Sequence, residues 1–192
     1  AAEMVFMAYD HAFFQAIPRI GTATVRAGNV IGGGDWAVDR IIPDCVRALD
    51  AGTPIQIRNP EATRPWQHVL DPLYGYLRLA SKLFERPAEF GGAWNFGPEL
   101  REGRTVLQLA EMAVDVWGDG EISIEPLLGA PFEHRFLQLN IDKAKLELDW
   151  MPNWSSDQAI FEAISWYKQV SNGSSPETVS LSQITAFMEQ LK

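Results

Sequence analysis

Apolar and polar residues follow two different periods along the chain, and these periods predict alternating helices and strands. Apolar positions recur at helical spacing at the start of the chain, over residues 41–51, 73–84, 106–117, 142–148 and 158–170, and in a final stretch ending at Lys192. Shorter runs rich in β-branched residues predict strands at 22–29, 54–59, 91–98 and 122–126. This alternation, which shows no internal repeat, favours the α/β class.

Proline, glycine and short polar residues mark several element boundaries. Pro43 lies in the first turn of the helix over 41–51, and Gly52 follows its end. Asp71 is expected to cap the helix that begins after Pro72. The segment SNGSSPETVS, residues 171–180, predicts a polar linker before the final helix.

The first helix is apolar on two sides. Met4 and Met7 share one face with Ala8 and His11, while Phe6, Tyr9 and Phe13 cover other faces. Because such a helix needs two neighbours, we expect one of them to be a second subunit, so that the protein forms a homodimer through this helix. The chain starts within this helical pattern and without an initiator methionine, so we expect a further segment to precede it.

Composition and charge narrow the possible partners. With 192 residues, 46% of them hydrophobic and 21% charged, the chain has the composition of one or two globular domains. A formal net charge of −9 argues against a surface for nucleic acids or anionic membranes. There is neither a run of 18 apolar residues nor a leader pattern near the start, which favours a cytoplasmic protein. The single cysteine, Cys45, excludes an internal disulfide and has no zinc-ligand spacing around it, so we expect no metal site.

Two motifs of dinucleotide-dependent enzymes are missing from the sequence. Gly28 and the three glycines at 32–34 do not have the spacing of a G-x-G-x-x-G fingerprint, and no acidic residue follows at the end of a second strand. No tyrosine is followed by a lysine four residues later. We therefore assign no catalytic residue within this chain.

The end of the first predicted strand is a candidate binding position. Ligands of open α/β sheets bind beyond the carboxyl ends of strands, and Asn29 lies at such an end. Its amide could donate to a phosphate or sugar oxygen, and the adjacent Gly28 could allow a close approach to the backbone. The alternative is a turn asparagine that bonds to its own backbone.

The segment NPEATRPWQHVLDP, residues 59–72, concentrates polar donors between prolines. Pro65 biases Arg64 toward an extended conformation, which suits its guanidinium to two phosphate oxygens; a surface ion pair with Glu61 or Asp71 is the alternative. Trp66 and His68 are expected on one face of an extended run. A histidine without a visible carboxylate or nucleophile partner is more often structural than catalytic.

Four segments together resemble a known family. VRAGNVIGGGDWAVDRIIPDCVRAL, PIQIRNPEATRPWQHVLDPLYGYLRLA, AWNFGP and DKAKLELDWMPNW are similar to the C-terminal part of extended short-chain dehydrogenase/reductases that act on nucleotide sugars, and specifically to the 4,6-dehydratases. The resemblance spans about residues 1 to 168. It implies the C-terminal part of a Rossmann-type α/β fold with a smaller substrate-binding lobe. Residues 1–30 would end the nucleotide-binding domain, 31–170 would form mostly the lobe, and 171–192 would be the linker and last helix.

The resemblance also implies the chemistry. Such dehydratases use bound NAD to oxidise the sugar C4 hydroxyl, eliminate water across C5 and C6, and return the hydride to C6, a step of deoxysugar and O-antigen synthesis. The NAD fingerprint and the catalytic Tyr and Lys would lie upstream of Ala1. Carried onto this sequence, the substrate-binding residues would be Asn29, Arg40, Pro54, Ile55, Gln56, Ile57, Arg64, Trp66, His68 and Arg135, while Ala27 and Gly28 would approach the nicotinamide.

The sequence departs from the family pattern at one place, and two alternative functions stay open. Where the family pattern has His-Glu-Ala-His-Tyr ahead of a Leu-x-Leu-Asp, this chain has Phe132-Glu-His-Arg-Phe136 and then Asn140, which leaves the roles of Glu133 and Arg135 open. The alternatives are a nucleotide-sugar 4-epimerase or another dehydratase of the family, and a non-catalytic module that binds nucleotide sugars.

Overall fold

The structure of the chain is a computed structural model that describes residues 1–125 and 137–191. Its helices are α1 (Ala2–Tyr9), a π-helical continuation η1 (Asp10–Phe14), α2 (Ile41–Asp50), α3 (Leu70–Glu85), α4 (Val106–Trp117), α5 (Asp142–Leu148), α6 (Ser156–Ser171) and α7 (Pro176–Gln190). Its strands are β1 (Ala23–Ala27), β2 (Asn29–Ile31), β3 (Ile55–Ile57), β4 (Thr63–Arg64), β5 (Trp66–His68), β6 (Gly92–Phe96), β7 (Arg104–Thr105) and β8 (Ile122–Ile124). The predicted α/β class is confirmed.

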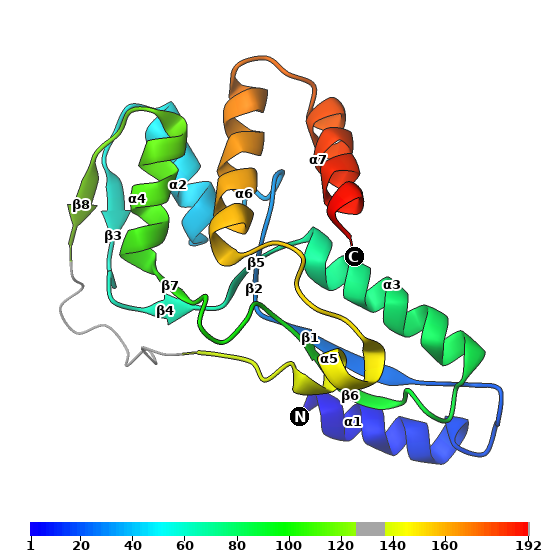
Figure 1. The fold of residues 1–192 in the computed structure, drawn as a ribbon. Coiled ribbons are helices and arrows are strands. Elements are labelled where there is room, and N and C mark those ends of the chain that lie inside the picture. Colours follow the sequence, from blue (N-terminus) through cyan, green and yellow to red (C-terminus); the bar gives the residue numbers. More distant parts are fainter. Residues whose placement is uncertain (126–136, 192) are drawn as a thin grey trace.

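The strands form short ladders rather than one wide sheet. β1 pairs with β6, β2 with β5 and β3 with β8, all in parallel, while β4 and β7 form an antiparallel ribbon. Figure 1 shows α6 crossing the middle of the molecule beside β2 and β5, with α2, α4, β3 and β8 at one end and α1, β1 and β6 at the other. The parallel pairs place several strand ends close together.

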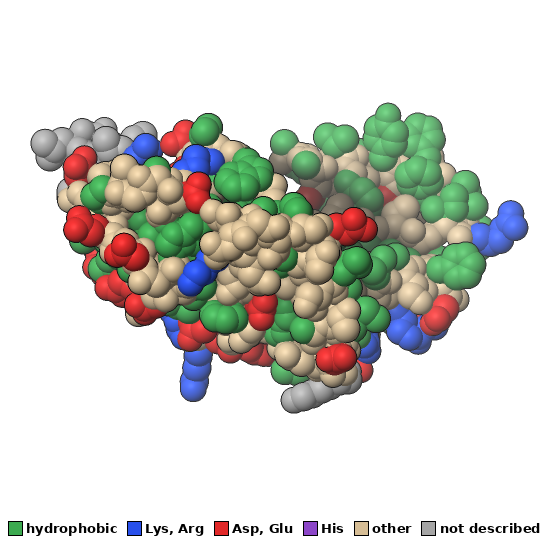
Figure 2. Space-filling model, turned by 90° about the horizontal axis from the view of Figure 1, so that it is seen from above, with side chains coloured by type: hydrophobic (Ala, Val, Ile, Leu, Met, Phe, Trp, Pro, Cys, Tyr) green, Lys and Arg blue, Asp and Glu red, His purple; other side chains and the backbone are tan. Residues whose placement is uncertain are grey.

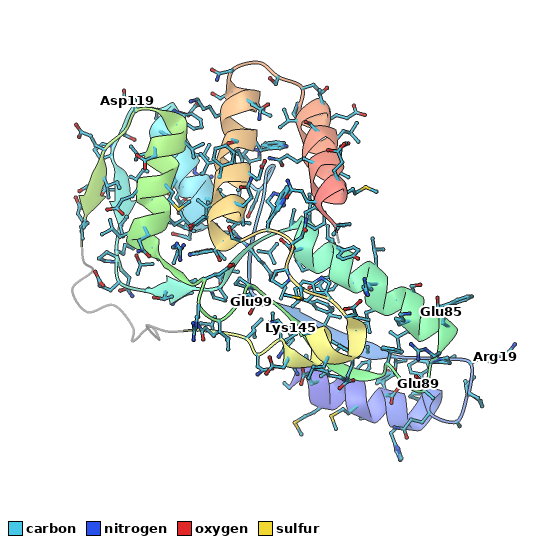
Figure 3. All side chains as sticks on the ribbon, in the orientation of Figure 1. Arg19, Glu85, Glu89, Glu99, Asp119 and Lys145 are labelled. Carbon is cyan, nitrogen blue, oxygen red and sulfur yellow. The ribbon has the colours of Figure 1, made fainter. Side chains whose placement is uncertain are left out.

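Two clusters of buried apolar residues hold these helices and strands together. The larger one joins α2, α4 and α6 to β2, β3 and β5, and it includes Cys45, since a free cysteine packs as a small apolar residue. The smaller one is rich in aromatic rings and joins β6, α3 and α5 around Trp94, Phe96 and Trp150. At its edge, Lys145 of α5 forms an ion pair of 2.5 Å with Glu99, which follows β6 (Figure 3).

Two boundary predictions are wrong. Helix α3 begins at Leu70 with Val69 in the cap position, so Asp71 lies inside the first turn and its Oδ1 instead accepts the backbone N–H of Asn153 at 2.6 Å. A distant loop thus competes successfully for the carboxylate that the local pattern assigns to a cap. Likewise, α7 begins at Pro176 within the predicted linker, because proline is well suited to the first helical turn.

Helix α1 exposes its apolar residues, as the pattern predicts. It has no buried residue within the chain, and Met4, Met7 and Tyr9 are all more than half exposed. Figure 2, which keeps the left-to-right order of Figure 1, shows apolar side chains gathered at the right-hand end of the molecule, where α1 lies. None of the helices described is both long and apolar enough to cross a bilayer.

Candidate functional site

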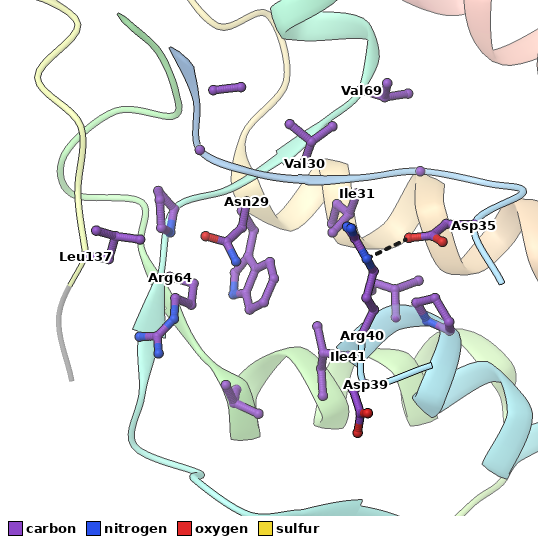
Figure 4. Close-up of a pocket in the computed structure, with 18 of the residues that line it drawn as sticks. Asn29, Val30, Ile31, Asp35, Asp39, Arg40, Ile41, Arg64, Val69 and Leu137 are labelled. Carbon is purple, nitrogen blue, oxygen red and sulfur yellow. Dashed lines mark ion pairs between the residues drawn. The ribbon is translucent and has the colours of Figure 1, made fainter. Parts of the chain in front are cut away.

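The main cavity opens where the chain changes its strand partner. The N–H of Gly28 donates to the carbonyl of Phe96 at the end of β6, and the N–H of the next residue, Asn29, donates to the carbonyl of Pro65 ahead of β5, both at 3.0 Å. Crevices in parallel α/β sheets form at such switch points. The cavity here has a volume of about 800 Å³, and its walls come from the β1–β2 junction, the loop after β2, the start of α2, and β4 and β5 (Figure 4).

Gly28 is required by the packing of the protein itself. A Cβ atom at this position would lie 2.7 Å from the carbonyl oxygen of Pro65, which is too close for any side chain. The group that approaches this glycine is therefore Pro65, the residue between Arg64 and Trp66. This contact holds the β1–β2 junction against the arginine-bearing segment.

Asn29 and two arginines supply polar groups to the cavity. Figure 4 shows Asn29 between Arg64 on one side and Arg40 on the other. Arg64 Nη1 donates to the carbonyl of Thr63 at 2.9 Å. Arg40 pairs with Asp35 over 3.7 Å, and the two side chains are 65% and 43% exposed, so this pair contributes little stability and leaves Arg40 able to reorient.

Trp66 forms an apolar wall that carries a polar atom. Its side chain is buried but borders the cavity, together with Val30, Ile41 and Val106. Its indole N–H has no hydrogen-bond partner among the described residues. Because this N–H is itself buried, a ligand would meet the carbon surface of the indole, and a flat or aliphatic group would suit this wall.

The glycine-rich loop after β2 is shaped by α6. A Cβ atom on Gly33 would overlap the indole of Trp166, and Gly34 has a φ of +86°, which favours glycine. The hydroxyl of Tyr167 donates to the carbonyl of Asp35 at 2.5 Å, and burial raises the pKa of Tyr167 to about 12. The glycines therefore serve packing against two aromatic rings more than 130 positions further along the chain, a relation that their spacing does not reveal.

His68 is a structural residue in this environment. Its side chain is 2% exposed, its Nδ1 accepts the N–H of Leu70 at 3.4 Å, and its ring meets the edge of Trp154 with a centroid separation of 4.8 Å. Burial lowers the pKa of His68 to about 4, so the imidazole is neutral at pH 7. Of the two readings of this histidine, the geometry favours the structural one.

The structure brings together some of the residues carried over from the family and separates others. Ala27, Gly28, Asn29, Arg40, Arg64 and Trp66 line the cavity. Pro54 precedes β3 and Gln56 lies in it, and both are exposed; Ile55 and Ile57 are in the larger core, and His68 is the buried last residue of β5. None of these five is among the residues that line the cavity. Arg135 and Glu133 fall outside the described residues.

Three buried polar residues near the cavity have no role in the sequence-based site. Gln67 donates its amide to the carbonyl of Phe96 at 2.9 Å, and Ser156 donates to the carbonyl of Trp66 at 2.8 Å. Asp71 is fully buried, and burial raises its pKa to about 7. In the described part of the chain, no group of three or more His, Cys, Asp or Glu residues could hold a metal ion.

Comparison with known proteins places these features in context. The chain is 38% identical over 191 residues to CDP-glucose 4,6-dehydratase of Salmonella typhimurium; the match covers 97% of this chain and 53% of that protein. No protein-family model matches the chain. The resemblance inferred from the sequence motifs is thus confirmed, and the chain spans about half the length of this relative.

Solved structures share the fold at low sequence identity. UDP-glucuronic acid 4-epimerase from Bacillus cereus matches with a TM-score of 0.71 and 19% identity, over 88% of this chain and 50% of that one. dTDP-glucose 4,6-dehydratase from Bacillus anthracis, solved in complex with NAD, matches with a TM-score of 0.69 and 21% identity, over 90% and 51%. At these identities the likeness establishes the Rossmann-type fold alone.

Proposed function

We propose that this chain is the substrate-binding part of a 4,6-dehydratase that acts on CDP-glucose, within the NAD-dependent epimerase/dehydratase family of extended short-chain dehydrogenase/reductases. The dehydratase is favoured over the epimerases because CDP-glucose 4,6-dehydratase is 38% identical to this chain, whereas UDP-glucuronic acid 4-epimerase is 19% identical. The observation that carries the proposal is the cavity at the strand switch, where an asparagine and two arginines meet an aromatic wall.

The polar groups of the cavity fit a nucleotide sugar. Arg64 presents a planar guanidinium, which can bind two phosphate oxygens at once, and a net charge of −9 makes such a local cation necessary for any anionic ligand. Asn29 can donate to a phosphate or sugar oxygen beside it. Arg40 would exchange its long contact with Asp35 for the ligand, and Trp66 would pack against a ring of the bound molecule.

The residues present agree with a dinucleotide bound mainly by another part of the protein. NAD supplies a reversible hydride acceptor for the oxidation of the sugar and the later reduction. Ala27 and Gly28 border the cavity with only a methyl group and backbone atoms, so they can pack against a flat ring but cannot hold a dinucleotide. The groups that bind NAD and move the substrate proton would come from outside these 192 residues.

The test is a calorimetric titration of the chain with CDP-glucose, UDP-glucose and dTDP-glucose, combined with an assay for the 4-keto product. We expect CDP-glucose to bind most tightly and no product to form, with or without added NAD. Preference for UDP-glucose would favour the 4-epimerase alternative. Product formation by the chain alone would contradict the assignment of the catalytic groups to another segment.

We further propose that α1 forms a homodimer interface. Met4, Met7, Tyr9 and Phe13 expose more apolar surface than a solvated helix usually does. Tyr9→Glu should therefore convert a dimer to a monomer in sedimentation experiments. Leu146→Glu, at an even more exposed apolar residue of α5, is the matched control and should leave the mass unchanged. A wild-type chain that sediments as a monomer would contradict the proposal.

A further inference from the structure

The short ribbon that carries Arg64 places a second arginine directly opposite it. In the β4–β7 register, Arg64 faces Arg104 and Thr63 faces Thr105. Side chains at opposite positions of an antiparallel pair point to the same side, and two like charges there are unfavourable unless one is compensated. A carboxylate that neutralises the positive charge of Arg104 therefore affects the position of Arg64.

Arg104 is held by the first turn of α6. Its Nη2 donates to Asp157 Oδ2 at 2.7 Å, which is a charge-assisted hydrogen bond, and its Nε lies 2.7 Å from Oδ1 in an ion-pair contact without hydrogen-bond geometry. The hydrogen bond with Asp157 raises the pKa of Arg104. Gly103 reinforces the ribbon, because a Cβ atom there would lie 2.9 Å from the side chain of Thr63.

The same turn holds the strand on the other side of Arg64. Ser156, which is 1% exposed, donates its hydroxyl to the carbonyl of Trp66 at 2.8 Å. Ser155 caps the helix by accepting the N–H of Gln158 at 3.2 Å, which fixes the orientation of this turn. Consecutive residues of α6 thus bond β5 directly and β7, which is the partner strand of β4.

We infer that the first turn of α6 is a positioning device for Arg64: Asp157 acts through Arg104, and Ser156 acts through Trp66, to hold the guanidinium at a fixed distance from Asn29. The backbone bond from Asn29 to Pro65 completes this arrangement on the cavity side. The inference rests on the proposed role of Arg64 in binding a pyrophosphate. None of the three positioning residues Arg104, Ser156 and Asp157 lines the cavity, so they act without touching the ligand.

Two substitutions that conserve charge test this device. Arg104→Lys keeps the positive charge but loses the guanidinium hydrogen bond to Asp157 Oδ2, and Ser156→Ala removes a neutral hydrogen bond, so neither change alters the net charge near the ligand. Arg78→Lys is the matched control: Arg78 is a similarly buried arginine that donates to Asp149 at 2.8 Å, and it is not among the residues that line the cavity. Circular dichroism and the melting temperature report whether each variant is folded.

We expect Arg104→Lys to weaken CDP-glucose binding by about tenfold, Ser156→Ala by somewhat less, and Arg78→Lys not at all. Binding of cytidine, which lacks phosphate, should be unchanged in all three variants. In an Arg64→Ala background, Arg104→Lys should cause no further loss, because both changes remove the same interaction. Equal losses for cytidine and CDP-glucose, or additive losses in the double variant, would overturn the inference.

A readout without ligand separates this inference from the proposed function. The side-chain Nε–H signal of Arg64 in a ¹⁵N spectrum should shift or broaden in Arg104→Lys and stay in place in Arg78→Lys. If wild type fails to bind CDP-glucose but this signal responds, the proposed function is wrong and the positioning stands. An Arg64 signal that is identical in wild type and Arg104→Lys refutes the positioning whatever the ligand.

Discussion

The segment from residue 59 to 72 has two halves with similar residue types and opposite surroundings. In the first half, Arg64 and Trp66 border the cavity, and the backbone of Pro65 receives a hydrogen bond from Asn29. In the second half, Gln67, His68 and Asp71 are almost completely buried. A change of surroundings within a few residues thus separates groups that can meet a ligand from groups that support the fold.

The comparison teaches that the polarity of a residue is a poor guide to its role unless its burial is known. β5 has α6 on one side and, on the other, the end of β6, to which Gln67 is bonded. Both faces of the strand are therefore covered, whereas an alternating pattern would leave one face open. Polar side chains enclosed in this way stabilise or destabilise the fold through their protonation and hydrogen bonds.

The largest expected effect concerns the opposite pH dependences of His68 and Asp71. Burial lowers the pKa of His68 from 6.5 to about 4, so between these values the unfolded chain binds a proton that the folded chain does not, and acid destabilises the fold. Burial raises the pKa of Asp71 from 3.8 to about 7, so in nearly the same window the folded chain holds the extra proton and acid stabilises the fold. The two contributions nearly cancel in the wild type.

Replacing either Asp71 or His68 should reveal the pH dependence of stability that the other residue causes. In Asp71→Asn, the free energy of unfolding, relative to wild type, should fall by roughly 3–4 kcal/mol between pH 7 and pH 4, since each shifted pKa unit corresponds to about 1.4 kcal/mol. In His68→Gln it should rise by a similar amount. Urea denaturation across this pH range measures both, and the double variant should return to the wild-type slope. Variants whose pH curves run parallel to wild type would show that these groups ionise as they do in the unfolded chain.

The next largest effect tests the half of the segment that borders the cavity. Arg64→Ala should weaken CDP-glucose binding by on the order of 2–4 kcal/mol, the usual loss when one member of a desolvated charge pair is removed. Arg64→Lys should recover only part, because an ammonium lacks the planar fork. His68→Gln serves as the control and should retain the affinity of wild type. If His68→Gln weakens binding as much as Arg64→Ala, the division of the segment into two halves is wrong.

Local patterns predicted most helices and the strand that leads to Asn29, because their periodicity is set by residues close in sequence. They also singled out Arg64 through the proline beside it, and the structure has this residue among those that line the cavity. They failed for Asp71 and for the glycine loop, since the Asn153 N–H and the rings of Trp166 and Tyr167 come from distant segments. Periodicity cannot reveal which remote group will satisfy a buried carboxylate or fill the space above a glycine.

The smallest expected effect falls on Gln67, at the boundary between the halves. Its amide donates to the carbonyl of Phe96, but that carbonyl also accepts the N–H of Gly28 at 3.0 Å and so stays paired without Gln67. Its Oε1 is buried without a partner among the described residues, which is itself unfavourable.

Gln67→Met keeps the volume of the side chain and removes both polar atoms, so the free energy of unfolding at pH 7 should change by less than about 1 kcal/mol. Gln67→Ala, which leaves a void, should cost about 2 kcal/mol or more. If methionine costs as much as alanine, the link to Phe96 stabilises the strand switch, and if methionine instead lowers the affinity for CDP-glucose, Gln67 belongs with the cavity half of the segment.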